Sequence, residues 1–175
     1  MPKTETRTLY LFTELSEEAQ EKVIERKRHY SERGNDWADE WRDTLSSANE
    51  EFGFKCNWEI GGCSGPTYCD VTEIRENALE DMKGTRLWKF LDKRYGFKEC
   101  PWTGVYSDEV FLKPFREFMK RPRRELTWKE LLQECCTEWA HGWLQDIEYQ
   151  FSDECIREEA ENEEDIWYTE QGEGA

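Results

Sequence analysis

The sequence predicts a helix-rich α+β domain with a small antiparallel sheet. Apolar residues recur at helical spacing over several long stretches, while a central segment alternates apolar and polar residues on both sides of a glycine-rich loop. Nine Trp, seven Tyr and nine Phe among 175 residues can supply a compact core, although 37% of the residues are charged. We therefore expect a single domain over residues 1–170, followed by a frayed tail at residues 171–175.

The N-terminal third predicts a strand and two helices. A short strand is expected at residues 8–12, after which Ser16 can cap a helix that runs to about residue 33. Gly34 ends this helix and Asp36 begins the next one. That second helix has the clearest amphipathic pattern in the chain, with spacings of four, four, three and four between Trp37, Trp41, Leu45, Ala48 and Phe52.

A hairpin and further helices complete the predicted fold. Residues 54–60 and 67–72 alternate apolar and polar side chains around a loop at 61–66, which indicates a β-hairpin. Residues 75–125 are helical in pattern but interrupted by Gly and Pro. Thr127 and Glu130 form a capping box for a helix to about residue 151, and Ser152 can cap a shorter one to about 161. A final strand at 166–169 is expected to join the opening strand and the hairpin in one sheet.

The charge of the chain is strongly negative and unevenly distributed. Its formal net charge is −16, and residues 144–175 alone carry twelve acids against one base, Arg157. Residues 75–126 are basic, with thirteen bases against nine acids. Because the acidic end also contains aromatic and aliphatic residues, we expect an ordered acidic surface there rather than a solvated tail.

The sequence has no membrane-spanning, signal-peptide or catalytic pattern, which bears on where the protein is located and on whether it is an enzyme. No stretch approaches the ~18 apolar residues of a membrane span, and the N-terminus has no apolar signal core, so we expect a cytoplasmic protein that does not associate with membranes. His29 and His141 are the only histidines, and neither lies in a pattern typical of a general base. With forty acids in the chain, pairs of carboxylates are too common to indicate a catalytic site. We therefore expect no enzymatic activity and no cofactor.

The seven cysteines are expected to be free thiols. Zinc binding by Cys56, Cys63, Cys69 and Cys100 is an alternative, although their spacings do not match the close pairs of structural zinc sites. Cys135 and Cys136 should point to different sides of their helix, so that they cannot chelate together and at least one lies in the core.

Two passages resemble a family of small proteins of tailed bacteriophages that are described as antitoxin-like. Residues 10–19 resemble the opening strand and capped helix of that family, and residues 152–154, 162–163 and 167–172 resemble its closing helix and strand. The hairpin occupies the place of an aromatic, glycine-containing hairpin in the family. Together these passages cover about a quarter of the chain. The resemblance implies a phage origin, a bacterial host cell, and a role in disabling a host system such as restriction or CRISPR.

Two acidic helices are the candidate partner-binding sites. The residues that they contribute are Asp36, Asp39, Glu40 and Asp43 on the first helix, and Glu154, Glu158, Glu159 and Glu161 on the second. Such ridges can enter the nucleic-acid groove of a basic protein or nucleoprotein complex, or they can serve only for solubility. The preferred hypothesis is a phage inhibitor of an anti-CRISPR or anti-restriction type that mimics nucleic acid. The alternatives are an antitoxin-like or regulatory partner that masks another surface, and a cysteine-based metal-binding protein.

A weaker candidate surface is the basic cluster of Lys120, Arg121, Arg123 and Arg124. At a net charge of −16, direct binding of duplex DNA is disfavoured because the whole chain repels phosphates. The cluster can instead contact an acidic patch, a guide RNA or the acidic end of a second copy, which would make the protein a homo-oligomer.

Overall fold

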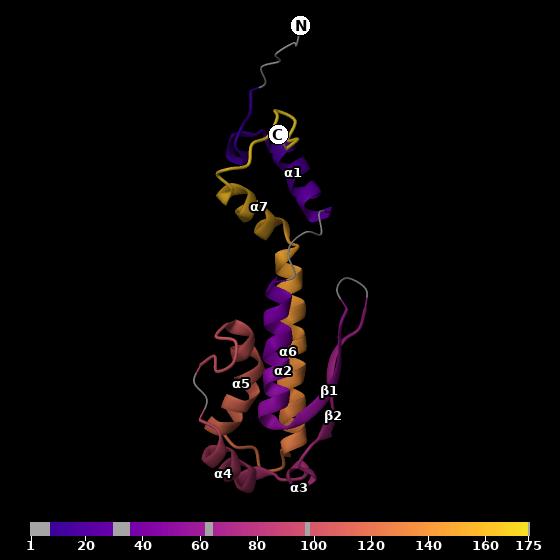
Figure 1. The fold of residues 1–175 in the computed structure, drawn as a ribbon, viewed down its shortest axis with the longest axis vertical. Helices are drawn as coiled ribbons and strands as arrows, with labels where there is room; N and C mark the ends of the chain where they lie inside the picture. Colours follow the sequence, from indigo (N-terminus) through magenta and orange to yellow (C-terminus); the bar gives the residue numbers. More distant parts are fainter. Residues whose placement is uncertain (1–7, 30–35, 62–64, 97–98, 175) are drawn as a thin grey trace. The chain divides into compact units, whose positions relative to one another are not determined.

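The computed structural model confirms the helix-rich α+β class. It describes residues 8–29, 36–61, 65–96 and 99–174, and within the helices it describes the backbone alone for His29, Asp36, Trp37, Asn77 and Ala78. The elements in chain order are η1 (Phe12–Glu14), α1 (Glu17–His29), α2 (Asp36–Phe52), β1 (Phe54–Ile60), β2 (Thr67–Ile74), α3 (Asn77–Glu80), α4 (Gly84–Arg94), α5 (Tyr106–Lys120), α6 (Trp128–Gln150) and α7 (Asp153–Asn162) (Figure 1). Among these described elements, no helix is both long and apolar enough to span a membrane.

The chain divides into two compact units. Unit 1 combines residues 1–34 with residues 148–175, and unit 2 comprises residues 35–147. The predicted domain of residues 1–170 thus contains two packed bodies, each with its own hydrophobic cluster. Unit 2 is continuous in sequence, whereas unit 1 is assembled from both ends of the chain.

The core of unit 2 lies between α2 and α6, which run side by side (Figure 1). Trp41 of α2 packs edge-on against Trp139 of α6 and stacks on Trp143, and the Trp139 indole N–H donates to the Trp41 carbonyl oxygen at 2.9 Å. Gly142 is required at this crossing, because a Cβ there would lie 2.7 Å from Val110 of α5 and 2.9 Å from the Trp41 ring. The large rings and the missing side chain therefore allow three helices to meet.

The hairpin of β1 and β2 covers one side of this helix pair. The strands are antiparallel, with Trp58 opposite Cys69 and Cys56 opposite Val71, and a register irregularity lies between Lys55 and Cys56. Trp58 packs against the Trp139 ring, while Gln133 of α6 accepts the Val71 N–H at 2.9 Å. The face of the hairpin that carries Cys56 and Cys69 is thus the face directed at α6.

Unit 1 is a smaller assembly of η1, α1 and α7. Its buried cluster consists of Phe12, Leu15, Ala19, Val23, Ile24, Ile156, Ala160 and Tyr168. The predicted Ser152 cap is confirmed, since the Ser152 Oγ accepts the Cys155 N–H at 3.2 Å. In unit 2, the predicted capping box at α6 is confirmed in the same way by reciprocal bonds between Thr127 and Glu130.

The chain ends pair with each other, as one of the two predicted pairings has it, but they do not join the sheet of the hairpin. The sheet that contains the hairpin has two strands, β1 and β2, in the part of the chain that the structure describes. Tyr10 instead exchanges two backbone hydrogen bonds of 2.9 Å with Tyr168, as an isolated bridge within unit 1. The predicted strand at residues 8–12 is cut short because Phe12 turns into η1 and buries its ring in the unit 1 core.

The predicted frayed tail is also ordered as far as residue 174. Gly172 has a φ of +80° and is buried, and a Cβ at this position would lie 2.6 Å from the Ala19 carbonyl oxygen. Its N–H donates to the Thr169 carbonyl at 2.8 Å, and its own carbonyl accepts from Arg26 of α1 at 3.0 Å. A glycine turn therefore holds residues 171–174 against α1.

Candidate functional site

The α2 acids lie opposite the buried face of their helix. Asp39, Glu40 and Asp43 are exposed, whereas Trp41 and Leu45 of the same helix are buried. Asp39 accepts from Arg42 at 2.7 Å, but among the described residues no ion pair involves Glu40 or Asp43. The side chain of Asp36 lies outside the described residues. The structure thus presents three of the four predicted α2 acids to solvent on a helix fixed by its core.

These acids border a polar hollow. Its volume is about 360 Å³, and it is lined by Glu40, Asp43, Ser46, Ser47, Trp102 and Thr103. The loop that contributes Trp102 and Thr103 is fixed by the buried carboxylate of Asp108, which accepts both of their backbone N–H groups at 2.8 and 2.9 Å. The acidic face of α2 therefore has a defined shape.

The α7 acids form a second exposed surface. Glu154, Glu158, Glu159 and Glu161 are all exposed, while Cys155, Ile156 and Ala160 face the core of unit 1. The Tyr149 hydroxyl donates to Glu158 at 3.3 Å, and the charge of Glu158 raises the pKa of Tyr149. Within the described ranges, neither Glu154 nor Glu161 makes an ion pair. The structure brings all four predicted α7 acids to solvent.

The only base of the acidic C-terminal segment does not neutralise this surface. Arg157 points toward α1, where its guanidinium donates to Gln20 at 3.0 Å. Bases of α1 instead bind other acids of the segment: Lys27 pairs with Glu163, and Arg28 pairs with Asp153. Cationic side chains therefore hold the segment against α1, while Glu154 and Glu161 make no ion pair among the described residues.

The two predicted acidic helices belong to different units. α2 lies in unit 2 and α7 lies in unit 1, so each is a surface of its own. Unit 1 adds exposed apolar groups to its acids, because Tyr149, Phe151, Ile166 and Trp167 are between 39% and 46% exposed. Large apolar side chains are thus exposed on both sides of the α7 acids in the sequence of unit 1.

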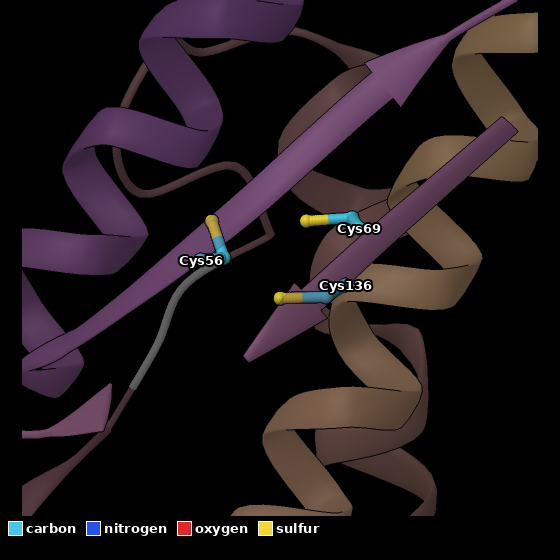
Figure 2. A group of neighbouring side chains, drawn as sticks. All are labelled: Cys56, Cys69 and Cys136. Carbon is cyan, nitrogen blue, oxygen red and sulfur yellow. The ribbon is translucent and has the colours of Figure 1, made fainter. Parts of the chain in front are cut away.

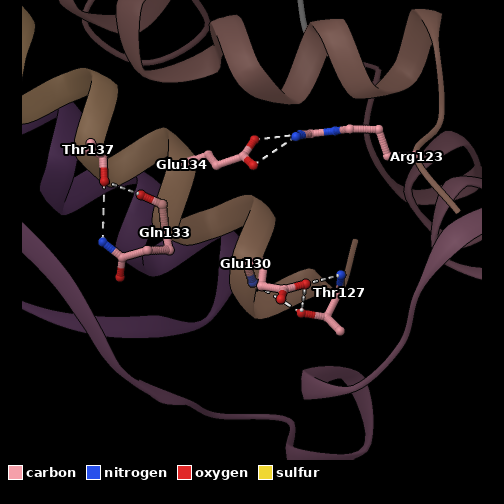
Figure 3. Close-up of polar contacts among 6 residues, drawn as sticks. All are labelled: Arg123, Thr127, Glu130, Gln133, Glu134 and Thr137. Atoms are coloured by element: carbon pink, nitrogen blue, oxygen red, sulfur yellow. Dashed lines mark hydrogen bonds and ion pairs between the residues drawn. The ribbon is translucent and has the colours of Figure 1, made fainter. Parts of the chain in front are cut away.

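The predicted basic cluster is partly compensated by acids. Arg123 makes a two-pronged ion pair with Glu134 of α6, as Figure 3 shows. Arg124 lies 3.7 Å from the Glu125 carboxylate, which also pairs with Lys83. Lys120 and Arg121 are exposed beside Arg123 in a groove of about 530 Å³ that includes the acids Glu117 and Glu134. The cluster is therefore a mixed surface rather than a basic one.

Three thiols meet inside unit 2. The Sγ atoms of Cys56, Cys69 and Cys136 all lie within 4.8 Å of one another. Cys56 comes from β1, Cys69 from β2 and Cys136 from α6, and Figure 2 shows the three side chains converging between the hairpin and the helix. Cys69 and Cys136 are buried, whereas Cys56 is half-buried. We call these three residues the thiol cluster.

The thiol cluster overlaps only in part with the predicted metal set. Cys56 and Cys69 belong to both, whereas Cys100 is half-buried and outside the cluster, and Cys63 lies outside the described residues. Cys136 is absent from the predicted metal set because its place beside Cys135 in the sequence indicated only a pair that cannot chelate together. The pair does point to different sides, since Cys135 lies against the Phe115 backbone of α5. The available signal was helical spacing, because Cys136 lies four residues from Leu132 and four from Ala140 on the buried face of α6.

The three thiols shift one another's pKa values. Hydrogen bonding from Cys136 and Cys69 lowers the pKa of Cys56 to about 3. Bonds to Cys56 and Cys69 and burial raise the pKa of Cys136. Cys136 lowers the pKa of Cys69, but Cys56 and burial outweigh this and raise it. The first proton of the thiol cluster is therefore lost most readily from the half-buried Cys56.

His141 is exposed on α6, and the His29 side chain lies outside the described residues. Comparisons with known proteins add no function: no family model, no curated protein and no solved structure matches the chain.

Proposed function

We propose that this chain is a non-enzymatic, phage-encoded inhibitor that binds a basic protein or nucleoprotein complex of a host defence or nucleic-acid-processing system. The observation that carries the proposal is the exposed acidic surface of α7. Its acids are exposed, the only base of the segment turns inward to Gln20, and large apolar side chains lie exposed in the same segment.

The combination of side chains suits a cationic partner surface. Carboxylates steer a basic surface during encounter, and exposed aromatic rings accept Lys and Arg through cation–π contacts. Aromatic anchors also supply most of the binding energy of many protein interfaces. Trp167 and Phe151 are the expected anchors in unit 1, and the α2 face with its bordering hollow is the expected second contact.

The binding test separates the two surfaces. Glu158→Lys/Glu161→Lys alters unit 1 and Glu40→Lys/Asp43→Lys alters unit 2, while Glu21→Lys/Glu25→Lys on α1 gives the same change in charge at exposed positions elsewhere. In capture from bacterial lysate, we expect each of the first two variants to bind the partner protein at least about tenfold more weakly than the control variant does. Added duplex DNA or RNA should displace what the unaltered protein captures.

The biological test uses phage plating. Expression of the unaltered chain in a bacterium with an active restriction or CRISPR system should restore plating of a sensitive phage, and the surface variants should restore less. If neither added nucleic acid nor a change from about 0.05 to 0.5 M salt reduces the binding of the captured protein, the hypothesis of nucleic-acid mimicry is wrong. Equal protection by all variants would contradict the assignment of the surfaces.

A further inference from the structure

The thiol cluster has the composition and spacing of a metal site. Three thiolates that surround a metal in one plane at ~2.3 Å lie about 4.0 Å apart. The three sulfurs of Cys56, Cys69 and Cys136 are already within 4.8 Å of one another, so small side-chain rotations suffice to close them around an ion. Two strands and a helix of one core fix their backbones, and this preorganises the donors.

We propose that Cys56, Cys69 and Cys136 bind one thiophilic d¹⁰ metal ion through three thiolates, with Cu⁺ preferred over Zn²⁺.

The number of donors gives the preference. Zn²⁺ is almost always four-coordinate in structural sites, whereas soft thiolates also select Cu⁺, which accepts three. No fourth His, Cys, Asp or Glu joins the group among the residues that the structure describes. The nearby Asn49 amide oxygen, 3.7 Å from the Cys56 sulfur, is a hard donor that suits neither ion well. Zn²⁺ would therefore need water as its fourth ligand.

The thiol cluster is open to solvent at Cys56 and can release its thiol protons when a metal ion binds. Cys56 is half-buried, so an ion can reach its sulfur from solvent and then bind the buried sulfurs of Cys69 and Cys136. Full binding removes the remaining S–H protons, which pass to the buffer, and no electron is transferred because the ion enters as Cu⁺. The affinity should accordingly fall as the pH falls.

Simple packing of small apolar side chains is the competing interpretation. Cys135 provides the internal comparison, because it is adjacent to Cys136 and equally buried, yet its thiol faces α5 and not the cluster. Replacing Cys135 by Ser imposes the same burial of a hydroxyl without removing a proposed ligand. Replacing Cys56 by Ser removes a ligand at a half-buried position, where the fold tolerates the change.

The experiment loads the purified full chain with one equivalent of Cu⁺ under anaerobic reducing conditions, and separately with Zn²⁺. Metal is counted by elemental analysis after gel filtration, affinity is obtained by competition with a chelator, and thiolate-to-metal absorbance is recorded. We expect about one equivalent of Cu⁺, a higher melting temperature, and at least about 100-fold weaker binding by Cys56→Ser, Cys69→Ser and Cys136→Ser. Cys135→Ser and Cys100→Ser should bind like the unaltered chain.

Three results would overturn the proposal. The unaltered chain could retain no metal, Cys56→Ser could bind as tightly as Cys135→Ser, or the chain could retain Zn²⁺ but not Cu⁺. Circular dichroism identifies any variant that does not fold, and Cys56→Ser then decides the outcome.

Discussion

Each unit carries one exposed acidic helix, but the two helices are stabilised in different ways. Unit 2 holds its acidic helix α2 by a large aromatic core, in which Trp41, Trp139 and Trp143 pack directly on one another. Unit 1 has a much smaller buried cluster and adds the pairs Lys27–Glu163 and Arg28–Asp153 between α1 and the C-terminal segment. The comparison shows that α2 is held by a large aromatic core, whereas α7 is held by a small apolar cluster together with ion pairs between α1 and the C-terminal segment.

This difference in stabilisation predicts which substitutions and solution conditions destabilise each unit. Apolar burial is insensitive to salt, whereas ion pairs at the surface are screened by it. Unit 2 should therefore respond to core substitutions and to protonation of its buried carboxylate. The attachment of α7 and the C-terminal segment to α1 in unit 1 should respond to charge reversal and to ionic strength.

The largest effect is expected at the core of unit 2. Trp139→Ala removes a fully buried ring and its hydrogen bond to the Trp41 carbonyl, and should lower the free energy of unfolding by about 3–5 kcal/mol. Trp167→Ala in unit 1 is the matched control, since this ring is 44% exposed and its removal should cost less than about 1 kcal/mol. Urea unfolding followed by circular dichroism checks both. Equal costs would contradict the assigned core.

A smaller effect is expected at Asp108. Its carboxylate is buried and accepts from Thr44, Thr103 and the backbone N–H groups of Trp102, Thr103 and Gly104. Burial alone would raise the pKa of Asp108, but the hydrogen bonds from Thr44, Trp102 and Thr103 outweigh it and lower the pKa. Asp108→Asn places an amide NH₂ group among hydrogen-bond donors that need an acceptor. It should lower the free energy of unfolding by about 2–3 kcal/mol at neutral pH.

The sign of the pH dependence follows from the lowered pKa. Stability from Asp108 is fully present above the pKa of the unfolded state, ~3.9, and is lost as the pH falls through the lower pKa of the folded state. The difference in unfolding free energy between the unaltered chain and Asp108→Asn should therefore shrink in acid. A difference that stays constant from about pH 6 to pH 2 would show that the carboxylate charge is not involved.

The smallest effect is expected at the charge pairs of unit 1. Lys27 and Glu163 are partly buried, so Lys27→Glu should cost about 1 kcal/mol, and the added change Glu163→Lys should restore part of the loss. Lys22→Glu disrupts the more exposed pair with Glu18 and should cost less. A double-mutant cycle at low and high salt measures the coupling. If Lys27 and Glu163 show no coupling at low salt, the ion pair does not contribute to the stability of unit 1.

Much of the fold could be predicted because local patterns and tertiary packing agree. Trp41, Leu45, Ala48 and Phe52 do line the buried face of α2, and the hairpin and both capped helices begin near the predicted residues. The chain ends were harder, because Phe12 satisfies its burial in η1 rather than in a strand. The pairing partner of Tyr10 depends on a residue 158 positions later, which no local pattern specifies.

The sites were predictable to different degrees. Exposure of the acids follows from the helical period, since acids opposite a buried stripe must face solvent. The thiol cluster does not follow, because its members come from three elements whose packing is tertiary. Cys69 and Cys136 are 67 positions apart in sequence, and only the docking of the hairpin on α6 brings them together.

The insertion of unit 2 between the halves of unit 1 has a consequence during synthesis. Residues 35–147 can fold while the remaining chain is still being made, because all their core partners have already left the ribosome. Helix α1 must wait for α7 and for Tyr168, so its basic residues Arg26, Lys27 and Arg28 are exposed early in the life of the chain. The acidic C-terminal segment thus acts late in translation as an intramolecular counter-ion that completes the N-terminal unit.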